Sequence, residues 1–145
     1  MPKLTSRKDL DLSGLLLDSM PPILRAIRET MRNTKDSQLT VPQFRVLGYV
    51  SLQSCTNKQL ADWQGVSLPA MSRMVDCLVR RELLIRTADT VDRRQVNLQL
   101  SKRGKEEFER LRLHVQTALA ERLAALSKAD RATVAAGLTA LKETL

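Results

Sequence analysis

Helix-capping residues in the middle of the chain constrain its fold more than any other feature of the sequence. Thr56 stands three positions before Gln59, which is the capping-box pattern that begins a helix, and Gly65 is placed to end that helix. Ser67 then caps a second helix that we expect to continue to about Arg81. Two helices joined by a tight, glycine-containing turn form a helix-turn-helix motif.

A β-hairpin is expected directly after this motif. Residues 83–88 and 95–100 are two short strand-like runs, and the second alternates apolar and polar side chains with the period of a strand. The polar stretch 89–94 between them would form a charged tip. The succession of helix, helix, strand, loop and strand predicts a winged helix-turn-helix within a mainly α-helical fold.

The N-terminal region has apolar residues at helical spacing, but two prolines divide it. Leucines cluster between residues 10 and 17, and Pro21 and Pro22 are expected to interrupt any helix that continues from them. We expect Ser19 to cap a new helix, which ends at about Asn33. The sequence therefore predicts a break in this region.

Further helices are predicted on both sides of the central motif. Thr40 and Gln43 form another capping box, which predicts a helix that continues to about Leu52. Beyond the hairpin, capping serines open two long amphipathic helices over residues 101–126 and 128–145. These helices exceed what a winged module needs, so their apolar stripes must pack either within the chain or against a second copy.

Positive charge is concentrated around the motif and the hairpin. The 145 residues contain 24 Lys and Arg against 16 Asp and Glu, which gives a formal net charge of +8. Residues 67–105 hold nine of these cations and four of the anions. Such a surplus suits a phosphate-binding face, because each neutralised phosphate releases condensed counterions. Charge alone leaves open a basic face that is only solvated.

The composition argues against several other classes of protein. With 43% hydrophobic residues, a chain of this length is expected to form one domain with a packed core. No apolar run approaches the roughly 20 residues of a membrane span, and the start does not resemble a signal peptide, so we expect a cytoplasmic protein without membrane contact. Two cysteines and one histidine argue against a metal site. We expect no cofactor and no enzymatic activity, because a nucleophile with a nearby base and a glycine-rich phosphate loop are both lacking.

The second helix of the motif divides into two faces. One face has the spacing of a core stripe, formed by Met71, Met74, Val75 and Leu78. The N-terminal turns of such a helix read base edges in the major groove of DNA. An ordinary amphipathic helix with a solvated face is the alternative. The candidate base-reading residues are Ser67, Leu68, Pro69, Ala70, Ser72 and Arg73.

The tip of the hairpin supplies a second candidate set. Asp92 is followed by Arg93 and Arg94, which places two guanidinium groups on a protruding loop. Arginine suits the narrow, electronegative minor groove, and Asp92 is positioned to hold one guanidinium by a bidentate pair. Charged turns also occur on surfaces that bind nothing. The position directly after a helix-turn-helix favours a wing that contacts DNA.

These candidates belong to a longer pattern of residues. Between residues 39 and 105 the chain carries Leu39-Thr40, Gln43-Phe44, Leu47, Leu60-Ala61, Val66-Ser67, Met71-Ser72-Arg73-Met74-Val75, Leu78, Leu83-Leu84, Asp92-Arg93-Arg94, Leu100-Ser101 and Gly104. In these residues the sequence resembles the MarR family of winged helix-turn-helix transcriptional regulators. The resemblance implies a homodimer, with dimerisation helices at about 1–38 and 101–145 and a winged helix-turn-helix lobe at about 39–100.

The resemblance also implies a function. It implies a repressor that binds a pseudo-palindromic operator in double-stranded DNA and releases it when a small aromatic compound binds between the dimerisation and DNA-binding regions. We expect such a pocket near the first helix, the helix around Phe44 and the long helix around His114, without assigning its residues. A non-specific basic DNA-binding protein, a redox-sensing regulator and a protein-interaction module are the alternatives.

The chain departs from the family pattern at three places, one of which is Pro21-Pro22 within the family's first helix. Residues 67–70 stand where the family usually carries small polar residues, which weakens hydrogen-bond readout of bases. Glu82 replaces a frequent glycine, so the turn into the hairpin lacks a residue that adopts the left-handed conformation easily. Redox relatives keep their reactive cysteine in the N-terminal region, where this chain has none. We therefore interpret Cys55 and Cys77 as packing residues.

Overall fold

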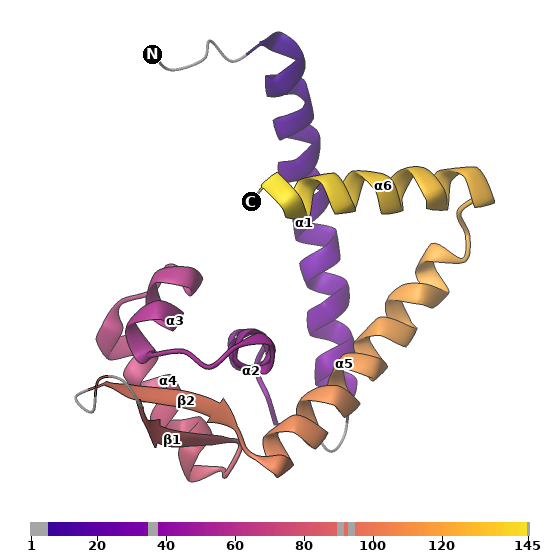
Figure 1. Cartoon of the computed structure of the whole chain (residues 1–145). Helices are drawn as coiled ribbons and strands as arrows, with labels where there is room; N and C mark the ends of the chain where they lie inside the picture. The colour runs from indigo at the N-terminus through magenta and orange to yellow at the C-terminus, as the bar shows by residue number, and fades with distance from the viewer. Residues whose placement is uncertain (1–5, 35–37, 90–91, 93–94, 145) are drawn as a thin grey trace.

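The computed structural model describes residues 6–34, 38–89, 92 and 95–144 (Figure 1). Its elements are α1 (Arg7–Asn33), α2 (Val41–Leu52), α3 (Asn57–Gln64), α4 (Leu68–Arg80), β1 (Leu84–Ala88), β2 (Val96–Leu100), α5 (Lys102–Leu123) and α6 (Lys128–Thr144). The fold is mainly helical with a two-stranded antiparallel hairpin, which confirms the predicted class.

The elements form a lobe and a set of long helices. Helices α2, α3 and α4 and the hairpin make up the lobe, while α1 and α5 extend away from it and α6 turns back from the end of α5 (Figure 1). Helices α1 and α5 pack together, and the guanidinium of Arg122 lies 3.6 Å from the carboxylate of Glu29.

One hydrophobic core joins the lobe to the long helices. Met31 extends it into α1, and Phe108, Leu111 and Val115 extend it into α5. The remaining core residues are Leu39, Val46, Leu47, Val50, Cys55, Leu60, Ala61, Met71, Val75, Leu78, Leu83, Leu84 and Leu98. Because the first half of α5 shares this core, the lobe is packed directly onto the helix that leads away from it.

The helix boundaries of the central motif follow its caps. The Thr56 hydroxyl accepts the N–H of Gln59 at 3.2 Å, and the Gln59 side chain accepts the N–H of Thr56 at 2.9 Å. Thr40 and Gln43 form the same capping box at the start of α2. Gly65 ends α3 with a φ of 70°, a left-handed conformation that glycine adopts without steric cost. The predicted helix-turn-helix is therefore confirmed.

The predicted break at Pro21 and Pro22 is wrong, because α1 runs through both prolines without interruption. Proline holds φ near the helical value, but it removes the hydrogen bond of its missing N–H and crowds the carbonyl group four residues earlier. Both prolines are exposed, so water can satisfy the carbonyl groups that lose this bond. Ser19 is not a cap, since its hydroxyl donates to the carbonyl of Leu15 at 2.7 Å within the helix. The cap of α1 is Ser6.

The hairpin is fixed both by its own register and by the loop after α2. Leu84 pairs with Leu100 and Ala88 with Val96, as expected for two antiparallel strands. Cys55 adds an isolated bridge to Leu98: the N–H of Leu98 donates to the carbonyl of Cys55 at 2.7 Å. This bridge ties the hairpin to the start of the helix-turn-helix.

The junction between the lobe and α5 is built from backbone contacts. The N–H of Ser101 donates to the carbonyl of Leu83 at 3.1 Å, and the Ser101 hydroxyl donates to the carbonyl of Glu82. A Cβ at Gly104 would lie 1.9 Å from the carbonyl oxygen of Leu83, so only glycine fits there. Glu82 takes a φ of 58°, which is the left-handed conformation that this turn requires in spite of the missing glycine.

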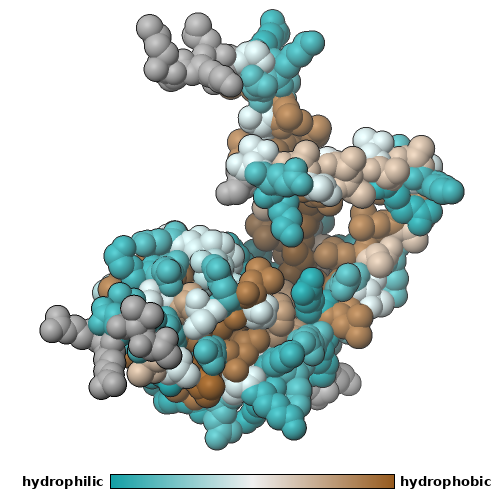
Figure 2. Space-filling view, in the orientation of Figure 1, coloured by the Kyte–Doolittle hydropathy of each residue, from teal (hydrophilic) through white to brown (hydrophobic). Residues whose placement is uncertain are grey.

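The distal parts of the long helices lie outside the core. The N-terminal half of α1 exposes Leu10, Leu12, Leu15 and Leu17, which are 61%, 66%, 65% and 70% exposed. Helix α6, over its described residues, has no buried side chain. Figure 2 shows apolar side chains along the exposed part of α1. None of the described helices is long and apolar enough to cross a membrane.

Candidate nucleic-acid interface

Helix α4 has one buried face and one face toward solvent. Met71, Val75 and Leu78 are completely buried against the core of the lobe, and Met74 is partly buried beside them. Arg73, on the other side of the helix, is exposed. The division into two faces predicted from the sequence is therefore confirmed, and the core holds α4 so that its outer face is uncovered.

The first turn of α4 offers few hydrogen-bonding groups. The Ser67 hydroxyl accepts the N–H of Ala70 at 3.3 Å and so caps the helix. Pro69 has no N–H and is exposed. Leu68 is 48% exposed, although it is one of the large apolar residues of the chain. The accessible surface of this turn is therefore mainly apolar.

A hydrogen bond links the two helices of the motif on their outer side. The Nδ2 of Asn57, in the first turn of α3, donates to the Oγ of Ser72 at 3.3 Å. This contact orients the Ser72 hydroxyl, which is one of the predicted base-reading groups. Asn57 itself was not predicted as a site residue, because its place beside α4 depends on how the two helices pack.

A cleft of about 570 Å³ lies between the starts of α3 and α4 and the hairpin. Its lining includes Leu68 and Ser72, which were predicted as base-reading residues. Lys58, Arg86 and Gln95 also line it and were not predicted from the sequence. The lining residues are Thr56, Asn57, Lys58, Leu68, Ser72, Arg86, Gln95 and Val96. Finding Arg86 from the sequence would have required the strand register, which places it opposite Leu98.

Ion pairs balance the acidic side chains around this cleft. The guanidinium of Arg86 pairs with the carboxylate of Asp76, on the outer side of α4. The ammonium of Lys58 lies 3.1 Å from the carboxylate of Asp62 within α3. Arg73 contributes a further exposed cation. The face of the lobe around α4 therefore combines positive groups with acids that already have partners.

Asp89 organises the described part of the hairpin loop. Its carboxylate accepts the N–H of Asp92 at 2.9 Å and the Nδ2 of Asn97 at 2.7 Å. The N–H of Gln95 donates to the carbonyl of Asp92 at 2.9 Å, which tightens the loop further. Asp92 is exposed at this tip. Arg93 and Arg94 lie outside the described residues, so their predicted pairing with Asp92 stays a prediction.

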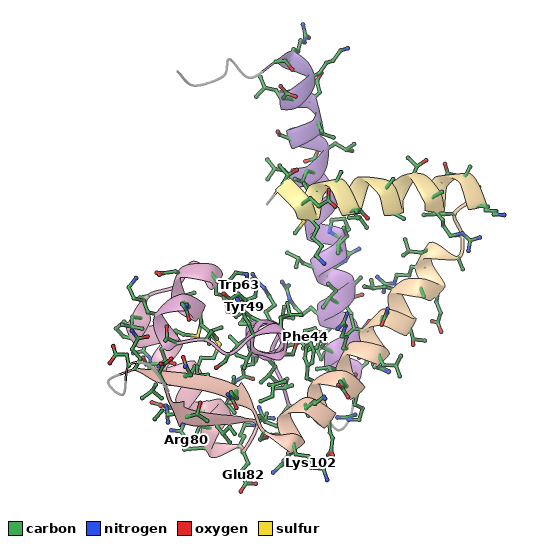
Figure 3. All side chains as sticks on the ribbon, in the orientation of Figure 1. Phe44, Tyr49, Trp63, Arg80, Glu82 and Lys102 are labelled. Atoms are coloured by element: carbon green, nitrogen blue, oxygen red, sulfur yellow. The ribbon has the colours of Figure 1, made fainter. Side chains whose placement is uncertain are left out.

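A second cluster of charged side chains lies at the C-terminal end of α4. Arg80 is the last residue of α4, Glu82 lies in the turn into the hairpin, and Lys102 is the first residue of α5 (Figure 3). The carboxylate of Glu82 accepts a hydrogen bond from Arg103 at 3.2 Å. This cluster belongs to the junction with α5, whereas the first turn of α4 lies at the opposite end of the helix.

Aromatic side chains mark the region in which we expected an effector pocket. Phe44 of α2 and Phe108 of α5 have ring centroids 5.2 Å apart. Tyr49 and Trp63 form a separate pair, 4.6 Å apart, on the side of the lobe toward α3 (Figure 3). His114, which we expected near the pocket, is exposed on α5. The structure thus brings Phe44 to the junction of α2 and α5.

The two cysteines differ in their surroundings. Cys55 is buried, and this burial raises the pKa of its thiol to about 11 from 9.0. A thiol with a raised pKa is a poor nucleophile at neutral pH, because the thiolate is the reactive form. Cys77 is half-buried, and the Nε2 of Gln43 lies 3.8 Å from its sulfur. In the described parts of the chain, no cluster of three acidic, histidine or cysteine side chains is arranged to hold a metal ion.

Comparisons with known proteins agree with this architecture. The MarR family model matches residues 39–96. Among curated proteins no sequence matches the chain. The chain resembles the crystal structure of RV1404 from Mycobacterium tuberculosis with 28% identity and a TM-score of 0.81, covering 97% of this chain and 95% of that one.

Two further solved structures extend the comparison. Wild-type apo MarR from E. coli has 25% identity and a TM-score of 0.77, covering 90% of this chain and 96% of that one. BpsR from Bordetella bronchiseptica, whose DNA binding is regulated by 6-hydroxynicotinic acid, has 22% identity and a TM-score of 0.67, covering 90% of this chain and 91% of that one. The likeness to BpsR shows a shared fold only.

Proposed function

This chain carries a MarR family domain over residues 39–96, and on this premise we propose that it is a sequence-specific transcriptional regulator that binds double-stranded DNA. The observation that carries the proposal is the uncovered outer face of α4, with its first turn beside the cleft and the hairpin. A helix held in this way enters a major groove with its N-terminal residues toward the base edges.

The proposed contacts follow from the position of each group. The base-reading residues are Ser67, Leu68, Pro69, Ala70, Ser72 and Arg73, and the wing residues are Asp92, Arg93 and Arg94. Removal of a groove-inserted arginine typically costs about 1–3 kcal/mol of binding free energy. We expect Arg94→Ala to weaken DNA binding by this amount at fixed salt. Unchanged affinity would contradict the role of the wing.

We further propose that the functional unit is a homodimer. The supporting observation is the set of apolar side chains on α1, α5 and α6 that one chain leaves exposed, including Leu12, Leu17, Leu113 and Leu138. A helix such as α6 is unstable in isolation unless its apolar side packs against another surface. We assign about residues 1–38 and 101–145 to dimerisation and about 39–100 to DNA binding.

Oligomeric state can be tested separately from DNA binding. Leu17→Glu would place a charge on the proposed interface, and we expect a monomer in analytical ultracentrifugation. Leu52→Glu is the matched control, because Leu52 is 83% exposed and belongs to α2, outside the helices assigned to the interface. A dimer that persists in the Leu17 variant and in Leu138→Glu would contradict the proposed interface.

A dimer explains how two lobes would select an operator. Two recognition helices reach successive major grooves on one side of DNA when they lie about 34–36 Å apart. A pseudo-palindromic sequence then presents the same half-site to each copy. A compound that changes the separation of the helices would weaken binding, because it favours a state that fits the operator less well. We propose that the protein acts as a repressor in this way.

The proposed effector is a small aromatic compound. BpsR provides a precedent in the same fold, since its DNA binding is regulated by 6-hydroxynicotinic acid. In this chain the contact of Phe44 with Phe108 lies where α2 meets α5, between the lobe and the long helices. MarR family regulators are typically non-enzymatic, and our proposal gives this chain no catalytic step. A regulator of chromosomal DNA acts in the cytoplasm, where we place this protein.

The experiment that tests the proposal is selection from random duplex oligonucleotides with the purified protein at physiological salt, followed by sizing of the bound complex. We expect an inverted repeat bound by a dimer. Binding without a recovered motif, and with a steep salt dependence, would instead identify a non-specific basic protein. No binding by protein free of small molecules would favour the protein-interaction module.

A further inference from the structure

We infer that the first turn of α4 recognises thymine through its C5-methyl group, with Leu68 as the principal contact. The inference rests on the proposed binding of DNA through α4 and specifies the chemistry of that readout. Its starting point is the composition of the exposed surface at the start of the helix, where Leu68, Pro69 and Ala70 follow the capping serine.

The side chains and backbone of residues 68–70 offer few groups with which to hydrogen-bond a base. Helix N-termini normally present free N–H groups, but Pro69 has none and the N–H of Ala70 is taken by the Ser67 hydroxyl. In the next turn, Ser72 already accepts a hydrogen bond from Asn57. A polar base edge placed against Leu68, Pro69 and Ala70 would therefore find few partners, because the hydrogen-bonding side chains of this face are those of Ser67, Ser72 and Arg73.

The hydrophobic core does not use Leu68. The apolar residues that α4 needs for its core, Met71, Val75 and Leu78, are completely buried, whereas Leu68 is 48% exposed and lines the cleft beside the hairpin. Its side chain therefore lies on the surface that the proposed docking brings against the major groove.

In that groove thymine is the base that presents an apolar group. Its C5-methyl contacts apolar side chains, whereas guanine, adenine and cytosine present acceptors or donors at the corresponding edges. An apolar first turn thus favours thymine because it buries the methyl group, which the other three bases lack. In a symmetric dimer the preference recurs once in each half-site.

The test uses the operator duplex recovered by selection. Each thymine of both half-sites is replaced in turn by deoxyuridine, which removes the methyl group and leaves the hydrogen-bonding groups unchanged. We expect one position, and its symmetry mate, to lose about fourfold in affinity, the ratio that corresponds to burial of one methyl-sized group. At that position 5-methylcytosine should bind about fourfold more tightly than cytosine, because it restores the same methyl group.

Two variants assign the effect to its residue. Leu68→Ala, an exposed substitution in the first turn of a helix, should bind the thymine and deoxyuridine duplexes equally well. Arg73→Ala is the matched control on the same face, and it should bind more weakly overall while keeping the fourfold ratio between the two duplexes. Circular dichroism checks that both variants are folded.

The outcomes separate this inference from the proposed function. A sequence-specific complex whose affinity does not change at any deoxyuridine position would overturn methyl recognition and leave the proposed regulator intact. Persistence of the deoxyuridine effect in Leu68→Ala would overturn the assignment to Leu68. Failure to select any sequence would overturn the proposed function and this inference with it.

Discussion

Arg86, on strand β1, and Asp76, on helix α4, form an ion pair that joins the hairpin to α4. Arg86 also lines the cleft between the hairpin and the starts of α3 and α4. The pair therefore neutralises a carboxylate on the outer side of α4, close to the surface that we propose for DNA. Both side chains are partly exposed, so the pair contributes little to the stability of the fold itself.

We expect Arg86→Ala to weaken DNA binding by about 1–3 kcal/mol, because it removes a cation and leaves the charge of Asp76 uncompensated near the phosphates. Adding Asp76→Asn should recover part of this loss. Affinities are measured by fluorescence anisotropy at fixed salt. Arg103→Ala is the control, since it removes one positive charge at the α5 junction. An equal loss in both variants would show that only net charge matters.

Gly104 should tolerate no side chain. A Cβ there would lie 1.9 Å from the carbonyl oxygen of Leu83, which is backbone and cannot move aside without shifting the hairpin or α5. We expect Gly104→Ala to lower the free energy of unfolding by about 3 kcal/mol in urea denaturation. Gly137→Ala is the control, because a Cβ there meets nothing within 4 Å in one chain. That variant should be up to about 1 kcal/mol more stable.

Substitution of Glu82 by glycine should stabilise the fold, because the φ of 58° at this position suits glycine better than glutamate. We expect Glu82→Gly to raise the free energy of unfolding by about 0.5–1 kcal/mol, through relief of backbone strain partly offset by loss of the exposed pair with Arg103. Glu82→Ala loses the same pair without relieving the strain, so it should not be stabilised. Thermal unfolding of both variants decides whether the left-handed turn is strained.

The ionisation of Cys55 should affect stability only at alkaline pH. Burial raises the pKa of its thiol to about 11, so between pH 9 and 11 the folded chain keeps a proton that the unfolded chain has lost. The resulting stabilisation of the unfolded state should lower the free energy of unfolding as pH rises through this range. The same titration of Cys55→Ala isolates the contribution. Identical pH dependence in the two proteins would contradict it.

The same burial predicts how the thiols react. In Cys77→Ser, a thiol reagent at pH 8 should label Cys55 only as fast as the protein unfolds, whereas Cys55→Ala should be labelled faster at the half-buried Cys77. Rapid labelling of Cys55 in the folded protein would instead support the redox-sensing alternative.

The starts of α2, α3 and α4 could be read from the sequence because they depend on short-range contacts. Thr40, Thr56 and Ser67 each bond to a backbone N–H three residues away, so no distant residue is needed to place α2, α3 and α4. Two short strand-like runs, the second with alternating apolar and polar residues, located both strands to within one residue. The two faces of α4 followed from helical periodicity, and burial of Met71, Val75 and Leu78 agrees with them.

What the sequence could not determine depends on residues that are far apart in the chain. Proline chemistry alone predicted a break in α1, whereas exposure to solvent allows the helix to continue through Pro21 and Pro22. The bond of Asn57 to Ser72 and the pairing of Arg86 with Asp76 exist only after α3, α4 and the hairpin have packed together. Local hydrogen bonds and periodicity thus determined the elements and their order. Packing of the core determined the cleft, because only the relative placement of the elements brings its lining residues within contact distance.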